Sequence, residues 1–221
     1  MSYFITGTDT GVGKTLISCA LLHAFAAQGQ RVVGMKPVAA GLDDDGKSED
    51  VLALRAASSF LATPGQVNPY SFYPAAAPHL AAQHVGVRIE LGRILTSYRE
   101  LAGQADVVIV EGAGGFRVPL NNQQDMADLA RELALPVILV VGMRLGCINH
   151  ALLTANAIAA AGLKCAGWVA NCVVAEMPLL RENVTAIQQR IAAPLLGVVD
   201  FQPQPDAHAA ARQLDLTLLH V

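Results

Sequence analysis

GTDTGVGKT, at residues 7–15, is the stretch that decides the fold of this chain. The apolar run YFIT at 3–6 precedes it and predicts a buried strand, and residues 16–28 behind it predict a helix. A glycine-rich turn between a strand and a helix is the setting of a phosphate-binding loop, where backbone N–H groups and the helix N-terminus surround an anion. The stretch therefore predicts a site for a nucleoside triphosphate.

The spacing of this loop differs from the common pattern G-x-x-x-x-G-K-[ST]. The first glycine of that pattern falls where this chain has Thr8, and Gly7 comes one residue too early. A glycine-rich turn that binds nothing is the alternative, but such a turn has no need of Gly13, Lys14 and Thr15 at the helix start. In a phosphate-binding loop Lys14 supplies a mobile cation for the outer phosphates, and Thr15 supplies a hydroxyl for Mg²⁺.

Length and composition predict one large domain spanning 1–221. Hydrophobic residues make up 53% of the chain but aromatic residues only 5%, which favours parallel strands covered by small-faced helices. The net charge is −3 and no basic stripe is visible, so we expect no nucleic-acid partner. No apolar run is long enough to cross a bilayer and no secretory signal is evident, so we expect no membrane association and a cytoplasmic protein.

Beyond the loop, predicted strands and helices alternate along the chain. We predict strands at 32–38, 106–110, 137–141, 165–170 and 195–199, a last strand at 216–219, and helices at 88–101, 125–134, 148–161 and 179–191. Residues 58–86 are predicted to be a long irregular segment. This alternation predicts an α/β fold, a mostly parallel sheet with helices on both faces, as in P-loop NTPases.

Charged side chains follow two of these strands. Lys36 lies near the carboxyl end of the strand at 32–38, and Glu111 directly follows the strand at 106–110. The carboxyl ends of parallel strands share one edge of the sheet, where ligands bind, so both side chains are expected near the loop. Asp50 opens a short helix on the same side and could help to hold Mg²⁺. Solvated charges at strand and helix ends are the alternative interpretation.

With these residues in place, the chain resembles the dethiobiotin synthetase family over most of its length. The motifs that carry the resemblance are GTDTGVGKT at 7–15, GMKPVAAG at 34–41, NPYSF at 68–72, VEGAGG at 110–115, PVILVVGMRLGCINHALLT at 136–154, GWVAN at 167–171 and PLLG at 194–197. The displaced first glycine is itself part of the family's pattern.

The resemblance implies a ligase of biotin biosynthesis. Such an enzyme joins 7,8-diaminononanoate, CO₂ and MgATP to make dethiobiotin, ADP and phosphate, through a carbamate and then a carbamic-phosphoric anhydride. ATP is a co-substrate and Mg²⁺ the metal cofactor. The family also implies a homodimer with the substrate site at its interface.

Site residues follow from the matching motif positions. The resemblance implies nucleotide binding by Asp9, Thr10, Gly11, Val12, Gly13, Lys14, Thr15, Asn171, Pro194 and Leu195. It implies catalytic roles for Thr10, Lys14 and Lys36, Mg²⁺ binding by Thr15, Asp50 and Glu111, and substrate binding by Lys36, Ala40, Gly146, Cys147, Ile148 and Asn149. Ala40 departs from the family pattern because some relatives have a serine there, and a tyrosine of some relatives is replaced near Asn183.

A second function class shares this kind of fold. MinD- or ParA-like ATPases use nucleotide to switch dimerisation and partner binding, and they carry a signature lysine early in the loop. This chain has Thr8, Asp9 and Thr10 there. A switch ATPase is therefore the alternative that ranks second.

Overall fold

The computed structural model describes residues 1–219 of the chain as one α/β unit. Its strands are β1 (Ser2–Gly7), β2 (Val32–Met35), β3 (Val38–Ala40), β4 (Tyr70–Phe72), β5 (Val107–Gly115), β6 (Val137–Met143), β7 (Cys165–Cys172) and β8 (Leu195–Val199). Its helices are α1 (Lys14–Ala27), α2 (Glu49–Ala57), α3 (Pro64–Val67), α4 (Pro78–His84), α5 (Leu91–Ala102), α6 (Met126–Leu133), α7 (Cys147–Ala160), α8 (Leu180–Gln188), α9 (Ala207–Ala211) and the 3₁₀ helix η1 (Leu216–Leu218).

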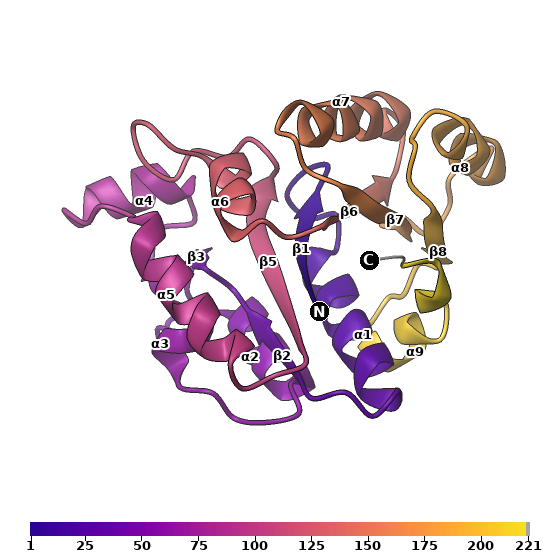
Figure 1. The fold of residues 1–221 in the computed structure, drawn as a ribbon. Coiled ribbons are helices and arrows are strands. Elements are labelled where there is room, and N and C mark those ends of the chain that lie inside the picture. The colour runs from indigo at the N-terminus through magenta and orange to yellow at the C-terminus, as the bar shows by residue number, and fades with distance from the viewer. Residues whose placement is uncertain (220–221) are drawn as a thin grey trace.

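Six strands form the main sheet in the order β2-β5-β1-β6-β7-β8, and every neighbouring pair is parallel. β1 lies between β5 and β6, so the loop after it opens at the middle of the sheet (Figure 1). The predicted parallel sheet is confirmed. A second, two-stranded parallel sheet of β3 and β4 lies beside it.

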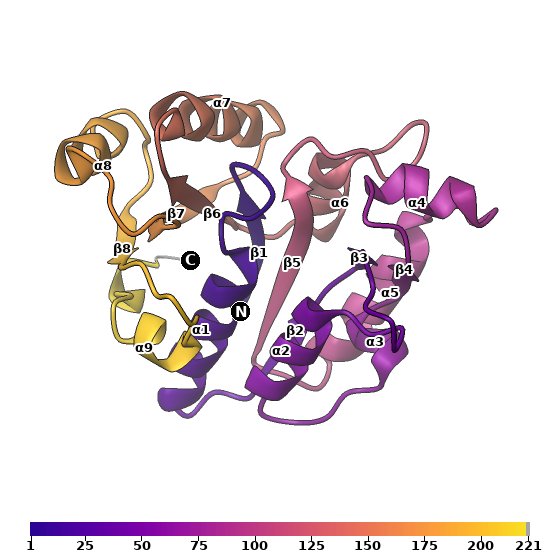
Figure 2. The same cartoon turned by 180° about the vertical axis from the view of Figure 1, so that it is seen from behind.

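Helices cover both faces of the sheet, as predicted, because its strands are apolar on both sides. In β1 the side chains of Tyr3 and Ile5 pack into one hydrophobic cluster, which contains buried residues of α1, α2 and α9. Phe4 points to the other cluster, with buried residues of α5 to α8. This alternation has the period of two that a strand imposes. The view turned by 180° in Figure 2 shows α1, α2 and α9.

The strand predicted at 32–38 is wrong at its end. β2 ends at Met35, and the chain then leaves the main sheet to form β3 from Val38. Pro37 has no N–H to donate to a ladder, and the Lys36 N–H donates instead to the Val67 carbonyl at 2.8 Å. The change of direction places Lys36 at the turn between the two sheets.

Further predictions differ from the structure. The strand predicted at 106–110 continues as β5 to Gly115, so Glu111 lies inside this strand and not at its end. Residues 216–219 are not a strand: the Asp215 carboxylate accepts from the Thr217 N–H and caps η1 there. The segment 58–86 is less irregular than expected, since it contains α3, β4 and α4. The helix predicted from residue 88 begins only at Leu91, after the extended residue Glu90.

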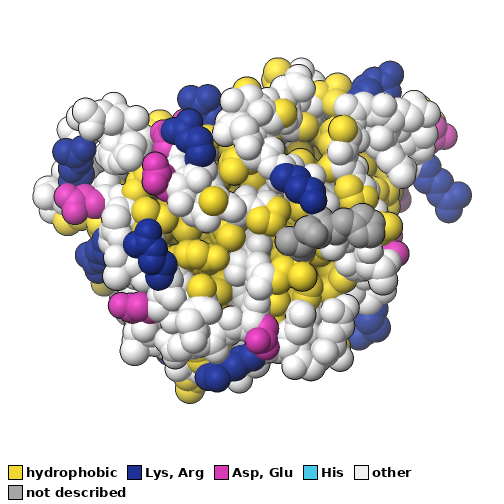
Figure 3. Space-filling model, in the orientation of Figure 1, with side chains coloured by type: hydrophobic (Ala, Val, Ile, Leu, Met, Phe, Trp, Pro, Cys, Tyr) yellow, Lys and Arg dark blue, Asp and Glu magenta, His cyan; other side chains and the backbone are white. Residues whose placement is uncertain are grey.

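The surface carries charges of both signs. On the face drawn in Figure 3 basic and acidic side chains are interspersed, mostly toward the rim, and hydrophobic side chains gather toward the centre. Within residues 1–219, each helix is too short or too polar to cross a membrane.

Candidate active site

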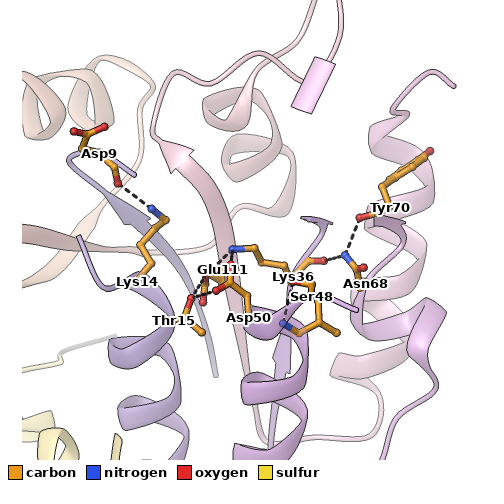
Figure 4. A network of polar contacts seen from close by, with 10 residues as sticks. Asp9, Lys14, Thr15, Lys36, Ser48, Asp50, Asn68, Tyr70 and Glu111 are labelled. Atoms are coloured by element: carbon orange, nitrogen blue, oxygen red, sulfur yellow. Dashed lines mark hydrogen bonds and ion pairs between the residues drawn. The ribbon is translucent and has the colours of Figure 1, made fainter. Parts of the chain in front are cut away.

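The loop at residues 7–15 joins β1 to α1 at the middle of the sheet. Gly11 and Gly13 adopt positive φ angles of 72° and 85°, which L side chains rarely adopt. Lys14 is the first residue of α1, is 7% exposed, and donates from Nζ to the Asp9 carbonyl at 2.9 Å. The lysine thus lies across the mouth of its own loop (Figure 4).

An ionic cluster lies below this loop. The Lys36 ammonium is 2.6 Å from Asp50 Oδ2 and 2.6 Å from Glu111 Oε1. The Thr15 hydroxyl lies 2.7 Å from Asp50 Oδ1 and 2.9 Å from Glu111 Oε1. These side chains come from α1, α2, the end of β2 and β5, and Figure 4 shows them pointing toward one another. The structure therefore brings together the strand-end and helix-start residues singled out from the sequence.

Backbone contacts fix the position of Lys36. The Asn68 side-chain amide donates to the Lys36 carbonyl at 2.6 Å and to the Tyr70 carbonyl at 2.8 Å. Asn68 begins the NPYSF motif, for which sequence reasoning had found no role. Its function in the structure is to hold the turn between the two sheets.

Burial and charge decide the ionisation of this cluster. Burial lowers the pKa of the Lys36 ammonium, but the facing carboxylates of Glu111 and Asp50 outweigh burial, so the net pKa is raised and Lys36 stays charged. Burial raises the pKa of Asp50, but the Lys36 charge outweighs it and lowers the pKa. Burial, followed by repulsion from Lys36, lowers the pKa of Lys14 to about 8. Among residues 1–219, Lys14 forms no direct ion pair, and its ammonium donates to the Asp9 carbonyl.

The oxygens of the cluster fit a small divalent cation. The Thr15 hydroxyl oxygen, Asp50 Oδ1 and Glu111 Oε1 lie within hydrogen-bond distance of one another, and oxygen ligands are those that Mg²⁺ prefers. Glu111 is fully buried, and its Oε2 has no hydrogen-bond partner among residues 1–219. Among residues 1–219, no three His, Cys, Asp or Glu side chains are arranged so that they could hold a metal ion by themselves. A cation here would thus depend on two carboxylates, one hydroxyl and oxygens from a ligand.

A cavity of about 760 Å³ joins the loop to this cluster. Its polar wall consists of Thr10, Gly11, Gly13, Lys14, Thr15, Lys36, Asp50 and Glu111. The rest of its lining is small and mostly apolar, and consists of Val38, Ala40, Ala75, Ala76, Ala77, Pro78, Ala113, Gly114 and Val118. The cavity can therefore hold a polyanion and an aliphatic molecule side by side. Sequence reasoning predicted Ala40 but missed residues 75–78, because they belong to the segment treated as irregular.

Asn171 supports the loop from β7. Its side-chain amide donates to the Val12 carbonyl at 2.8 Å, and the residue is 4% exposed. A Cβ atom added to Gly13 would lie 2.1 Å from Asn171 Nδ2. The glycine therefore allows the amide to approach the loop.

Pro194 and Leu195 are not brought to this edge. Leu195 pairs with Trp168 at the start of β8, whereas Val199 at its end pairs with Asn171. Four residues of strand, about 13 Å, separate Leu195 from that end. The segment at the loop's edge of the sheet is instead the one that leaves β8 after Val199.

The predicted carboxylate-binding residues lie at the start of α7, outside the cavity walls of their own chain. Gly146 is exposed with a φ of 94°, and Cys147 is 2% exposed with its sulfur 3.9 Å from Asn183 Oδ1. Ile148 is half-buried and Asn149 exposed. Arg144, just before them, forms an ion pair with Asp9 of the loop.

Comparison with known families gives a match over almost the whole chain. Residues 1–209 match the family model described as an AAA domain. A protein of Nitrosospira multiformis named ATP-dependent dethiobiotin synthetase BioD is 54% identical over 97% of this chain and 94% of its own length. Proteins of the same name from Aromatoleum aromaticum and Xanthomonas euvesicatoria pv. vesicatoria are 54% and 50% identical, each over 97% of both chains.

Solved structures show the same fold at much lower identity. A ParA family ATPase from Chlorobium tepidum has a TM-score of 0.59 at 14% identity, covering 100% of this chain and 99% of its own. The MinD cell division protein of Aquifex aeolicus has a TM-score of 0.56 at 17% identity, covering 98% and 89%. At such identities the likeness establishes the architecture alone.

Proposed function

The chain belongs to the dethiobiotin synthetase family, and we propose that it converts 7,8-diaminononanoate, CO₂ and ATP to dethiobiotin, ADP and phosphate. The observation that carries this proposal is the cavity, which the phosphate-binding loop and Lys36 line together with a group of small apolar side chains. ATP and a substrate with an aliphatic chain and reactive amines could meet there. We propose that the enzyme acts as a cytoplasmic homodimer.

The chemistry needs anions to approach one another. One substrate amine takes up CO₂ as a carbamate, and the γ-phosphoryl group of ATP is transferred to a carbamate oxygen. The second amine then attacks the carbonyl carbon, phosphate leaves and the ring closes. Two anions must meet in the second step, so a site that performs it has to concentrate positive charge.

Lys14 and Lys36 are the positive charges that suit this step. Both line the cavity and are nearly buried, at 7% and 4% exposure, where electrostatic interactions are stronger than in water. Lys14 would hold the β- and γ-phosphates, and Lys36 the carbamate and the transferring group. Thr10 would add hydroxyl or N–H contacts to the phosphates from the loop. These side chains position and stabilise, and no covalent intermediate with the protein is required.

Thr15, Asp50 and Glu111 are the residues that would hold Mg²⁺. When bound, the ion would supply neutralising charge for the phosphate oxygens. The support lies in the convergence of three oxygens and in the buried, unpaired Glu111 Oε2, for which a cation would be a partner. Asp9, Gly11, Val12 and Gly13 contribute the remaining backbone of the phosphate loop.

The nucleotide base would lie beside Asn171, at the same edge of the sheet. Pro194 and Leu195 would lie away from the base, because Leu195 begins β8 and pairs with Trp168, whereas Val199 at its end pairs with Asn171. The residues that follow Val199 are the better candidates for this contact.

The substrate chain would lie along the apolar wall that includes Ala40. Its carboxylate would then lie outside the polar half of the cavity, and we propose that a second copy of the chain receives it at the start of α7, through Gly146, Cys147, Ile148 and Asn149. Leu145, which precedes these residues, is 98% exposed, as an interface residue would be in a single chain. Cys147 is buried and contributes packing.

A switch ATPase remains the second candidate. Its support is the likeness to MinD and ParA structures, which establishes the fold only. The two functions differ in what controls ATP consumption, because a synthetase should hydrolyse ATP only with its substrates.

The test measures phosphate release by the purified protein with ATP and Mg²⁺, with and without diaminononanoate and bicarbonate, and dethiobiotin by mass spectrometry. We expect phosphate and dethiobiotin in equal amounts only with all components present. 7-Aminononanoate is the matched control for dethiobiotin formation because it has only one amine and cannot form the cyclic urea. ATP turnover that is unchanged without the diamine would refute the synthetase proposal.

A further inference from the structure

Lys36 contacts the same carboxylate oxygens that are proposed to hold the metal ion. Its ammonium is 2.6 Å from Glu111 Oε1, the oxygen that also lies 2.9 Å from the Thr15 hydroxyl. It is also 2.6 Å from Asp50 Oδ2, on the carboxylate whose other oxygen contacts Thr15. An ammonium and a divalent cation cannot both lie this close to one pair of carboxylates without strong repulsion.

We infer that Lys36 is an internal counter-ion, which neutralises Asp50 and Glu111 in the free protein and withdraws toward the cavity when a divalent cation binds there. The inference deepens the proposed function, on which the identity of the cation site rests. It makes cation binding and the release of Lys36 toward the phosphate and carbamate a single event. Lys36 would then become available for its electrostatic role only after the cation has arrived.

Burial explains why the free protein needs such a counter-ion. Glu111 is fully buried at the middle of β5, and a buried carboxylate without a partner is costly. Among residues 1–219 the Lys36 ammonium is its charged partner within ion-pair distance. Because Lys36 also lines the cavity, its side chain has open space into which it can withdraw.

Lys14 offers a natural comparison within the same cavity. It is also a nearly buried lysine, but its ammonium donates to the Asp9 carbonyl and forms no ion pair with Asp50 or Glu111. A general effect of positive charge on cation binding would appear for both lysines. Competition for the same oxygens would appear only for Lys36.

The experiment measures Mn²⁺ binding to the nucleotide-free protein by electron paramagnetic resonance of the free ion. We expect Lys36→Met to bind Mn²⁺ at least tenfold more tightly than the unmodified chain, and Lys14→Met to change binding less than threefold. Lys47→Met, at an exposed lysine, controls for net charge. Equal tightening in Lys36→Met and Lys14→Met, or no tightening in Lys36→Met, would overturn the inference. Ligation plays no part in this measurement, so its outcome is distinct from that of the phosphate-release test.

A measurement on the unmodified chain covers the case in which Lys36→Met does not fold. The chain has four lysines, so ¹³Cε-labelled lysine gives a simple spectrum. We expect added Mg²⁺ alone to shift the Lys36 signal more than those of the other three. An unmoved Lys36 signal at saturating Mg²⁺ would contradict withdrawal from the carboxylates.

Discussion

Replacement of Gly13 by alanine tests how closely the phosphate loop is fitted to β7. Gly13 has a φ of 85°, a conformation that costs an alanine about 1–2 kcal/mol. The new Cβ would also lie 2.1 Å from Asn171 Nδ2, so the amide has to move and release the Val12 carbonyl. Losing that buried hydrogen bond costs about 1–3 kcal/mol. Together, the two terms predict that Gly13→Ala lowers the free energy of unfolding by about 2–5 kcal/mol.

Gly11→Ala is the matched control for this prediction. Gly11 also has a positive φ, 72°, but a Cβ there would meet nothing within 4 Å. Only the backbone term applies, so we expect a loss of about 1–2 kcal/mol. The difference between the two variants isolates the displacement of Asn171.

Urea unfolding, followed by the fluorescence of the single, fully buried Trp168, measures these losses. In a double-mutant cycle, Asn171→Ala removes both the hydrogen bond and the obstacle. Adding Gly13→Ala to Asn171→Ala should then cost only the backbone term, so the two changes should be less than additive by about 1–3 kcal/mol. Two results together would refute the reasoning. The losses of unfolding free energy in Gly13→Ala and Gly11→Ala would agree within about 0.5 kcal/mol, and the double-mutant cycle would be additive.

Two further predictions concern ligands. Because the pKa of Lys14 is lowered to about 8, about half of the Lys14 side chains are neutral at pH 8. Bound phosphates favour the charged form, so nucleotide binding should take up about half a proton at pH 8 and almost none at pH 6.5. Calorimetry in buffers of different ionisation enthalpy measures this uptake, and an uptake that persists in Lys14→Met would contradict the assignment. Ala40 lines the cavity where some relatives are expected to have serine, so Ala40→Ser should lower the KM for the diamine up to about tenfold through one added hydrogen bond. Ala76→Ser, on the same wall, is the control, and equal KM values for both variants would argue against a specific contact.

The convergence of the site was predictable because it depends on topology. Lys36 directly follows β2, which is a parallel neighbour of β5, and Glu111 lies in β5 one residue beyond Val110, the residue that pairs with Met35 at the end of β2. Parallel strands place their carboxyl ends at one edge, so the two side chains come together. The place of Asp50 in the site was predictable from its position at the start of a helix, which Ser48 caps. For these residues, sequence position alone fixes which side of the sheet the side chain reaches.

Other parts of the site could not be obtained in this way. The wall at residues 75–78 comes from a connection without periodicity, so its position depends on packing that the sequence pattern does not report. The resemblance implies nucleotide binding by Pro194 and Leu195 as well as by Asn171, although the predicted strand at 195–199 begins at Leu195. A parallel strand begins at the edge opposite the ligand, so this prediction already conflicted with the predicted topology, as the pairing of Leu195 with Trp168 shows.

The break at Pro37 shapes the cavity beside the phosphate loop. A strand continuing to Val38 in the main sheet would leave Lys36 within the ladder. Because β2 stops at Met35, β3 instead joins β4 in a second sheet, and Val38 and Ala40 become one wall of the cavity. Asn68 holds this turn through the Lys36 carbonyl. The same few residues thus place the lysine beside the carboxylates and build part of the apolar lining of the cavity next to the phosphate loop.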